Sequence, residues 1–342
     1  MALAICSCMR AKMASQVRSS MKILIAYDGS RCAEAAIDDL TRAGLPQKTT
    51  ATVVSVAEVW LPPPNSLDVD TGIKLDPESQ ELIRQHLSEN KGVVAEAETL
   101  ANHAKTRIKQ MFPNWLVSSR ATYGSPAFEI LILADQLEAD LVVVGSHGRS
   151  ALSRLFLGSV SQKVLTEARC SVRVARGRIE VDSGPERIVV GFDATSGSDA
   201  TVAEVARREW DLASEVKLIT ATEQVVPVAI SRFMSPANVS VANPSHLERC
   251  WIEKRASGSI EKLRTAGLGV DLIVTAGNPK QLIVEEAERW GADCIFVGAN
   301  SSAGCFQQFL MGSTSAAIGA RAHCSVEVVR SKDGPRPERR KL

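Results

Sequence analysis

The feature that most constrains the fold of this chain is an internal duplication. Four segments of the first half recur in the same order in the second half. The recurring pairs are "KILIAYDGS" (22–30) with "RIVVGFDATSGS" (187–198), "GSPAFEILILADQ" (124–136) with "GNPKQLIVEEAER" (277–289), "ADLVVVGSHG" (139–148) with "ADCIFVGANS" (292–301), and "CSVRVAR" (170–176) with "CSVEVVR" (324–330). Equivalent residues are 165 positions apart in the first pair and 153 or 154 apart in the others. A repeat of roughly 150 residues has the size of a whole domain, so we expect two copies of one domain, the second about twelve residues shorter in its middle.

The apolar runs in each copy are continuous, as in "LVVVG", and do not alternate with polar residues. Such runs indicate strands that are buried on both faces of a parallel sheet. The expected strands are 22–27, 51–57, 116–122, 140–145 and 170–175 in the first copy, and 187–192, 215–221, 270–275, 293–298 and 324–329 in the second. The expected helices are 31–43, 78–111, 126–138 and 159–168, and then 197–212, 244–266, 279–290 and 313–321. Each copy is therefore predicted to be a five-stranded α/β domain with helices on both faces, connected by right-handed crossovers.

The domain boundaries follow from the repeat. We expect the first domain at residues 21–177, a polar linker with Gly and Pro at 178–186, and the second domain at 187–330. Residues 1–20 contain Arg, Ser and Ala but no acidic residue, which is compatible with a disordered extension, a transit peptide or a start codon placed too early. The basic tail 331–342 is expected to be disordered, and the Pro-rich stretch 59–75 to form an exposed loop or lid.

Composition argues against several classes of function. The formal net charge is +1 and 4% of the residues are aromatic, so we expect neither a nucleic-acid-binding surface nor attraction to an anionic membrane. The sequence has no apolar run of about eighteen residues, the length that a membrane-spanning helix needs. The eight cysteines are scattered, without the spacing of a zinc or redox motif. This pattern indicates free thiols in a reducing, cytoplasmic compartment.

The segment "GSHGRSALSRLFLGSVS", which begins at Gly145, gives the strongest indication of a ligand. In an open parallel sheet, ligands bind beyond the carboxyl ends of the strands, near the point where strand order reverses. Gly145 lets the chain turn off its strand, and Gly148 lets a ligand approach the main chain. Gly158 opens the next helix, whose free N–H groups and positive dipole end suit a phosphate. The hydroxyls of Ser159 and Ser161 are expected to add hydrogen bonds.

The spacing of these residues resembles the nucleotide-binding signature of the universal stress protein family. It reads Gly145-Ser146-His147-Gly148, nine residues, then Gly158-Ser159. The opening "ILIAYDGS", the second strand "VVSVAE" and the last strand "CSVRVAR" are also similar to that family. The resemblance covers both copies, from residue 21 to about 330. It implies two Rossmann-like domains of the adenine nucleotide alpha hydrolase-like type, each a parallel sheet of strand order 3-2-1-4-5 flanked by helices, and it implies binding of ATP.

The resemblance also implies which residues contact the nucleotide. The adenine and ribose contacts of the family correspond to Ala26, Tyr27, Asp28 and Val56. The ribose and triphosphate contacts correspond to Val144, Gly145, Gly148, Gly158, Ser159, Val160 and Ser161. A magnesium or manganese ion on the phosphates is compatible with the family, although the sequence shows no dedicated carboxylate cage for a metal.

Two side chains near this site have a second interpretation. Asp28 also precedes a predicted helix, where Asp is favoured, so it can serve the helix start instead of a ligand. His147 has no paired carboxylate in the sequence that would make it a general base. We therefore expect His147 to be an exposed side chain or one that lies beside the phosphates.

The second copy departs from the signature. It keeps Asp193, Gly298, Gly312, Ser313 and Ser315. However, Ser301 replaces Gly148, and the run between the two outer glycines is one residue longer. Where glycine has a positive φ, a side chain costs on the order of 1 kcal/mol or more. We therefore predict a degenerate second site with weak or absent nucleotide binding, although Gly304 restores some backbone freedom.

Three functions remain open. The first is an ATP-binding stress or signalling module with an unidentified protein partner and at most slow hydrolysis or autophosphorylation on Ser159 or Ser161. The second is an ATP-pyrophosphatase or adenylyl-transfer enzyme, which carries an S-G-G-x-D-S loop after its first strand where this chain has "DGSRC". The third is a scaffold without a ligand, which fits the second copy better than the first.

The family resemblance also implies how the two copies meet. Members of the family dimerise through their last strands, and apolar edge strands that stay unpaired risk aggregation. We expect the two copies to make this contact internally, with 170–175 against 324–329, so that one chain forms a pseudo-dimer. Whether two such chains form a homodimer is left open.

Overall fold

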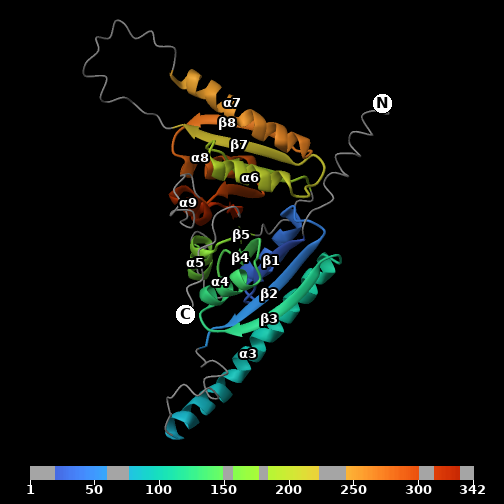
Figure 1. Cartoon of the computed structure of the whole chain (residues 1–342), viewed down its shortest axis with the longest axis vertical. Helices are drawn as coiled ribbons and strands as arrows, with labels where there is room; N and C mark the ends of the chain where they lie inside the picture. The colour runs from blue at the N-terminus through green and yellow to red at the C-terminus, as the bar shows by residue number, and fades with distance from the viewer. Residues whose placement is uncertain are drawn as a thin grey trace, which may run out of the picture.

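Figure 1 shows the computed structural model of the chain, which describes residues 20–59, 77–148, 157–176, 184–222, 244–299 and 312–331. Several sequence predictions fall outside these ranges. They concern nearly all of the N-terminal extension, the Pro-rich loop, most of the linker, the C-terminal tail, and the two second-copy residues Ser301 and Gly304.

The first half alternates strands and helices as the periodicity predicts. Its elements are β1 (Met21–Ala26), α2 (Arg31–Asp39), the short 3-10 helix η1 (Leu40–Arg42), β2 (Thr49–Ala57), α3 (Pro77–Met111), β3 (Leu116–Tyr123), α4 (Pro126–Gln136), β4 (Leu141–Gly145), α5 (Ser159–Glu167) and β5 (Ser171–Ala175). The second half repeats this series as β6 (Arg187–Gly191), α6 (Ser196–Ala206), β7 (Glu215–Thr222), α7 (Pro244–Thr265), β8 (Gly269–Ala276), α8 (Pro279–Trp290), β9 (Cys294–Gly298), α9 (Ser313–Arg321) and β10 (Ser325–Val329).

The strands of both halves form one ten-stranded sheet with the order β3-β2-β1-β4-β5-β10-β9-β6-β7-β8. Within each half all pairs are parallel and the order is 3-2-1-4-5, which confirms the predicted fold class. The halves meet at β5 and β10, which pair antiparallel. These are the two strands for which the sequence analysis expected internal pairing.

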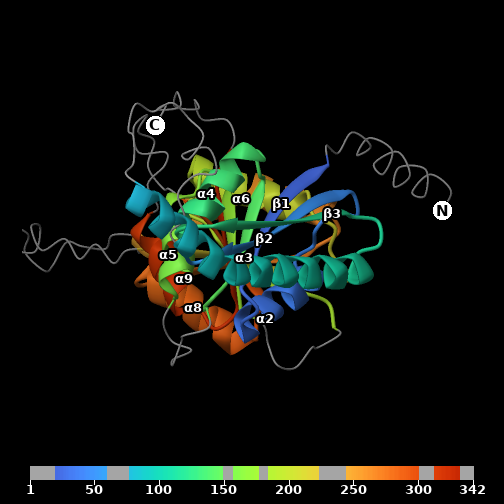
Figure 2. The ribbon, with the colours of Figure 1, turned by 90° about the horizontal axis from the view of Figure 1, so that it is seen from below.

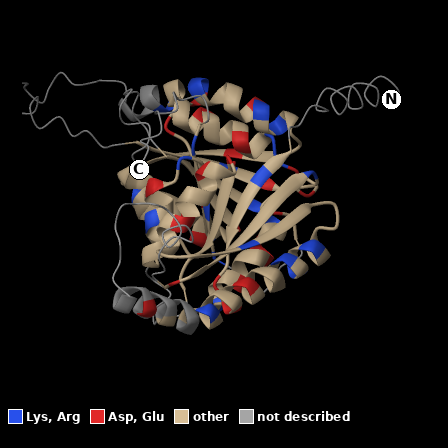
Figure 3. Cartoon of the chain, turned by 60° about the horizontal axis from the view of Figure 1, so that its bottom comes forward, with Lys and Arg blue, Asp and Glu red and all other residues tan. Residues whose placement is uncertain are grey.

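The helices cover both faces of the sheet, and the apolar core differs between the faces. Figure 2 shows α2 and α4 on opposite sides of the strands of the first half. On the α4 face one apolar core runs across the junction and joins β4, β5 and α5 to β9, β10 and α9. On the α2 face each half has its own core. Figure 3 shows that charged residues gather on the helices and leave the strands largely uncharged, as expected for strands that are buried on both faces.

Two predicted helices are shorter than the sequence suggested. The helix expected at 31–43 ends at Asp39 and continues only as a 3-10 turn. The helix expected at 197–212 ends at Ala206. The residues after Ala206 leave the helix because they bind the first half: Arg208 Nη1 donates to Ala43 O (2.7 Å), and the Glu209 N–H donates to Gly44 O (2.9 Å). These contacts join positions far apart in the sequence, so local periodicity does not reveal them.

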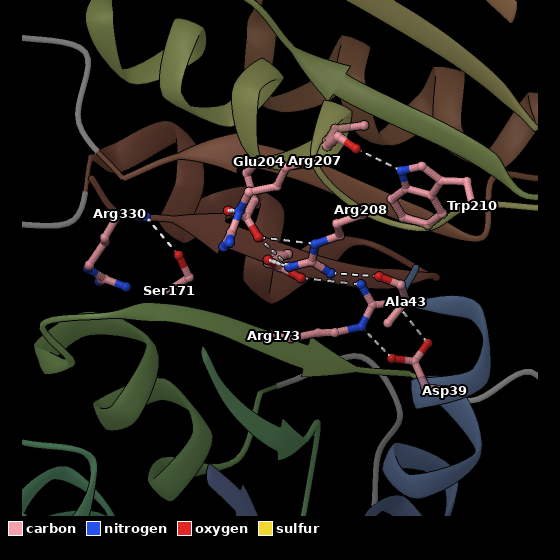
Figure 4. A network of polar contacts seen from close by, with 11 residues as sticks. Asp39, Ala43, Ser171, Arg173, Glu204, Arg207, Arg208, Trp210 and Arg330 are labelled. Carbon is pink, nitrogen blue, oxygen red and sulfur yellow. Dashed lines mark hydrogen bonds and ion pairs between the residues drawn. The ribbon is translucent and has the colours of Figure 1, made fainter. Parts of the chain in front are cut away.

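A buried group of five charged residues lies where the halves meet (Figure 4). Arg173 on β5 lies opposite Glu327 on β10, both fully buried, with 3.5 Å between Nη1 and Oε2. Arg173 Nε also donates to Asp39 Oδ2 on α2 (2.6 Å). Arg208 donates to Glu327 and, at 3.0 Å, to Glu204 on α6. Negative and positive groups therefore alternate from α2 to α6 through the centre of the sheet.

The two carboxylates of the second half respond differently to this environment. Burial raises the pKa of Glu327, and the nearby Arg208 and Arg173 offset that effect only in part. Burial also acts to raise the pKa of Glu204, but Arg208 and Arg207 together bring it below its ordinary value. Arg208 is therefore the cation that the two carboxylates share.

We predict that Arg208→Met lowers the free energy of unfolding by about 3 kcal/mol or more, because it leaves two buried carboxylates without their shared cation. Arg207→Met is the matched control. Arg207 is the neighbouring residue and contacts the same Glu204, but its side chain is 49% exposed, so its loss is expected to cost at most about 1 kcal/mol. Urea unfolding followed by circular dichroism measures both values, and equally small losses would contradict the prediction.

In the ranges that the structure describes, no helix is both long enough and apolar enough to cross a membrane.

Candidate functional site

The candidate site lies at the carboxyl edge of the sheet, between β1 and β4. In the order 3-2-1-4-5 this is the point where strand order reverses, and ligands of open α/β sheets bind there. Asp28 follows β1, and Gly148 follows β4. A Cβ added to Gly148 would lie 3.0 Å from Asp28 Oδ2. The structure thus brings these two predicted site residues together, in a close approach that a side chain at position 148 would obstruct.

Apolar side chains beside this edge come from three strands. Val144 on β4 is buried in the core of the α4 face, and Ala26 on β1 and Val56 on β2 pack against that core while remaining partly exposed. Val160 on α5 packs against the same core. These four predicted contacts therefore lie on one face of the sheet.

Tyr27 differs from the other predicted contacts. Its side chain is buried in the core of the opposite face, where its hydroxyl donates to Glu34. Burial first, and then the hydrogen bond to Glu34, raise the pKa of Tyr27. Its N–H donates to Val54 O within the sheet (2.9 Å). Successive residues of a strand point to opposite faces of the sheet, so the Tyr27 side chain points away from the site. Any ligand contact by Tyr27 therefore involves its main chain.

Asp28 serves the start of α2 and also faces the site. Its Oδ1 accepts the Ser30 N–H (2.9 Å), which closes a turn around Gly29 at φ 76°. Ser30 then caps α2, because its Oγ accepts the Ala33 N–H (3.1 Å). The second carboxylate oxygen, Oδ2, is the atom beside Gly148. The role of Asp28 at the start of α2 is therefore confirmed, whereas its contact with a ligand stays a prediction.

Glycine is needed at these loop positions because a side chain would clash with neighbouring atoms, and not because the backbone has a positive φ. A Cβ on Gly145 would lie 2.9 Å from the carbonyl carbon and oxygen of Cys32, where α2 passes closely over the end of β4. Among the described residues, the glycines with positive φ do not include Gly145, Gly148 or Gly158. The positive φ invoked for the replacement of Gly148 by Ser301 is therefore absent at Gly148. The glycines instead allow close approach of neighbouring backbone and side-chain atoms.

Helix α5 begins at the site without a side-chain cap. Its N-cap residue is Gly158, which makes no side-chain capping hydrogen bond, and Ser159 is exposed at the first helical position. The Gly158 N–H donates to Ser146 O (2.8 Å) and holds the helix start against the end of β4. The first N–H groups of α5 therefore have no acceptor from the N-cap side chain, which suits an anion.

Ser161 has a different role from the one that the sequence suggested. Its buried hydroxyl donates to Gly145 O (2.6 Å). The proton that was expected to reach a phosphate is therefore used to fix α5 to the last residue of β4. The prediction of Ser161 as a hydroxyl donor to the ligand is corrected to a positioning role.

His147 is buried, so the expectation of an exposed side chain is wrong, and the alternative of a side chain beside the phosphates stays a prediction. It is 9% exposed, and its Nδ1 lies 3.1 Å from Ser146 Oγ. Ser146 Oγ also donates to Cys32 Sγ (3.8 Å). Burial, together with the positive charge of Arg176, lowers the pKa of His147. Sequence reasoning missed this Cys32–Ser146–His147 contact because it joins α2 to the loop after β4.

The described part of the second site has the same internal bonds. Gly298 lies against the backbone of α6, the Gly312 N–H donates to Ala299 O (2.6 Å), and the Ser315 hydroxyl donates to Gly298 O (2.5 Å). Ser313 is exposed at the first position of α9, as Ser159 is in α5. The scaffold of the two sites is therefore equivalent. The loop that carries Ser301 and the additional residue lies outside the described residues.

The two sites differ in the turn that follows the first strand of each half. Asp193 Oδ1 accepts the Thr195 N–H (3.1 Å) and the Thr195 hydroxyl (2.6 Å), in a turn like that of Asp28. The residue between them is Ala194 at φ 59°, where the first half has Gly29. A non-glycine residue in this left-handed region is uncommon and strained. Aligning the two copies shows the Gly-to-Ala change, but not that the position needs a positive φ.

No metal centre is formed by the residues that the structure places. Within the described ranges, no group of three or more His, Cys, Asp and Glu side chains is arranged to hold a metal ion.

Comparison with known proteins identifies the family. The universal stress protein family matches twice, at residues 20–176 and 185–330. A universal stress protein of Mycobacterium tuberculosis, Rv2005c, is 25% identical over 331 residues, which covers 92% of this chain and 99% of the relative. Universal stress protein YxiE of Bacillus subtilis is 30% identical over 157 residues, 45% of this chain and 98% of that protein.

Solved structures agree in fold. A universal stress protein from Archaeoglobus fulgidus has a TM-score of 0.52 at 18% identity and covers 91% of this chain and 97% of its own. The putative universal stress protein from Pseudomonas aeruginosa has a TM-score of 0.52 at 14% identity, with 93% and 95% covered. The double match and the repeated sheet lead to one conclusion: this chain belongs to the universal stress protein family, in a tandem form with two domains.

Proposed function

We propose that the first half of this protein binds ATP at the carboxyl edge of β1 and β4, and that the protein acts as a nucleotide-dependent binding module in a stress response. In this proposal ATP is hydrolysed slowly at most, and an unidentified signalling protein reads the nucleotide state. The cysteines are scattered in the sequence without the spacing of a zinc or redox motif, which supports a reducing, cytoplasmic setting. The observation that carries the proposal is the close approach of Gly148 to both Asp28 and the uncapped start of α5: a Cβ on Gly148 would lie 3.0 Å from Asp28 Oδ2, and a Cβ on Gly158 would lie 3.8 Å from Gly148 N.

The chemistry of the edge suits a nucleotide in two parts. Ala26 and Val56 offer partly exposed apolar surface next to Asp28, a combination that suits the flat base and the hydroxyls of ribose. The start of α5 offers N–H groups and a positive dipole end to the phosphates. A magnesium or manganese ion would come with the phosphates, because the described part of the chain holds no carboxylate cage of its own.

The adenylyl-transfer alternative is less well supported. An enzyme of that group binds phosphate with the loop after the first strand. Here the polar atoms of that loop are used within the chain: the Ser30 N–H binds Asp28 and the Ser30 Oγ caps α2. A scaffold without a ligand remains a proposal for the second half alone, where a strained turn replaces the glycine turn.

We predict that Gly158→Val abolishes nucleotide binding and that Gly312→Val does not. A Cβ on Gly158 would lie 3.4 Å from His147 Cα and Ser146 O, so a branched side chain displaces the start of α5 from β4. Gly312 is the equivalent residue of the second half and serves as the matched control. The protein is purified, denatured, and the released nucleotide is identified by chromatography. Nucleotide that survives Gly158→Val, or that is lost only with Gly312→Val, would overturn the assignment.

A second prediction concerns Asp28. Asp28→Asn keeps an acceptor for the Ser30 N–H but removes the charge beside Gly148. We expect the affinity for adenosine and for Mg-ATP to fall about tenfold, because hydrogen bonds to a charged group are worth about 1.5–3 kcal/mol. Asp193→Asn is the equivalent control and is expected to leave the affinity unchanged. Calorimetric titration measures both ligands, and an unchanged affinity for Asp28→Asn argues against Asp28 as a ligand contact.

A further inference from the structure

The junction between the halves is symmetric except at its centre. At one end of the strand pair the Arg176 N–H donates to Ser325 Oγ (2.9 Å), and at the other end the Arg330 N–H donates to Ser171 Oγ (3.1 Å). These pairs are equivalent in the two copies, since "CSVRVAR" and "CSVEVVR" align residue for residue. Such bonds would form equally well between two copies of β5 or two copies of β10. They do not determine which strand pairs with which.

The guanidinium groups at the strand ends follow the same symmetry. Arg176 Nη2 donates to Gly319 O of α9 (2.8 Å), and Arg330 Nη2 donates to Leu165 O of α5 (2.6 Å). Each half therefore binds the carboxyl end of the helix that the other half presents. These hydrogen bonds could also form between two first halves or between two second halves, so they do not select the partner.

Only the central position distinguishes the two strands by charge. Arg173 and Glu327 are equivalent in the repeat and directly opposite in the antiparallel register. Pairing of β5 with a second β5 about the same centre would place Arg173 opposite Arg173. Pairing of β10 with β10 would place Glu327 opposite Glu327. Both positions are fully buried, and like charges that face each other in a buried interface are costly.

The surrounding charges add to the cost of pairing two second halves. Arg173 has its own anion, because Asp39 of the same half holds it through two hydrogen bonds of 2.6 and 3.1 Å. Glu327 and Glu204 share Arg208, and the first half has Ala43 where the second has Arg208. Two second halves would therefore bring four carboxylates together with two guanidinium groups. Pairing of one first half with one second half gives the observed arrangement, in which carboxylates and guanidinium groups alternate.

We propose that the Arg173–Glu327 pair selects the partner of each strand edge, so that the β5 edge accepts the β10 edge of a second half and rejects a second β5 edge. The usual partner is the second half of the same chain, because the linker keeps it at high local concentration. The two halves are therefore not interchangeable in assembly.

The test uses two full-length variants that carry different affinity tags. Arg173→Glu places two carboxylates at the centre of its own junction, and Glu327→Lys places two cations there. When the variants are co-expressed, the first half of the Glu327→Lys chain and the second half of the Arg173→Glu chain can form a wild-type junction across chains. The remaining two halves then also meet with opposite charges at the centre.

We expect one tag to retrieve the other variant at least about tenfold more than in same-variant pairs or in a pair of tagged wild-type chains. Native mass measurement is expected to give a 1:1 complex of two chains. The matched control reverses the exposed pair of Arg169 and Asp135, whose side chains are 49% and 48% exposed, in the same two-variant design. Retrieval at the wild-type level is expected for this control.

Every other result overturns the proposal. Equal retrieval in mixed and same-variant pairs would show that charge does not select the partner. If both variants unfold at the wild-type temperature and neither tag retrieves the other variant, charge does not select the partner either. If the single variants do not fold alone, co-expression still decides, because a wild-type junction is available only across chains. The absence of any soluble mixed complex would then contradict the proposal.

Discussion

The rest of the structure depends on the antiparallel contact between β5 and β10. This contact turns two five-stranded sheets into one, and the apolar core of the α4 face continues across it from β4 to β9. The helices that open the two candidate sites also meet there: the absent Cβ of Gly319 on α9 leaves room for Leu165 of α5, whose Cδ2 would lie 2.7 Å from it. The position of each site is therefore set relative to the other by the packing of the junction.

The charges inside this contact need a reason, because burying ions is costly. Replacing a buried ion pair by apolar residues is often neutral or stabilising, so the pair is weak evidence for stability. Its loss on one side is nevertheless costly, because the remaining charge is stranded. Glu327 is fully buried, and burial raises its pKa even beside Arg208 and Arg173. A group that is kept at such a cost is better explained by selection of the correct strand pair than by a gain in free energy.

Much of the fold could be predicted because it is encoded in local patterns. Continuous apolar runs such as "LVVVG" located the strands, and the repeat located the second sheet. The end of α6 could not be predicted, because Arg208 and Glu209 leave the helix to bind residues of the other half.

Less of the site could be predicted than of the fold. The motif brought Asp28 and Gly148 together correctly, but it could not show that Ser161 bonds to a strand carbonyl or that His147 is buried. Those outcomes depend on side-chain direction and on contacts between distant loops. In the same way, the alignment of the copies shows Arg173 and Glu327 as a substitution, and only the strand register shows them as a pair.

The charge asymmetry also bears on how the two sites came to differ. In a homodimer of identical chains, every substitution appears in both sites at once. In this chain each half always meets the same unlike partner, so one site can change while the other is retained. Ala194 at φ 59° occupies the turn position of Gly29, while the bonds of Gly312 and Ser315 that hold the scaffold are the same as in the first half. Because the first half is paired with a second half, the turn of the second site can change while its scaffold is retained. The second half can then lose its ligand and still supply the strand and helix contacts that support the first site.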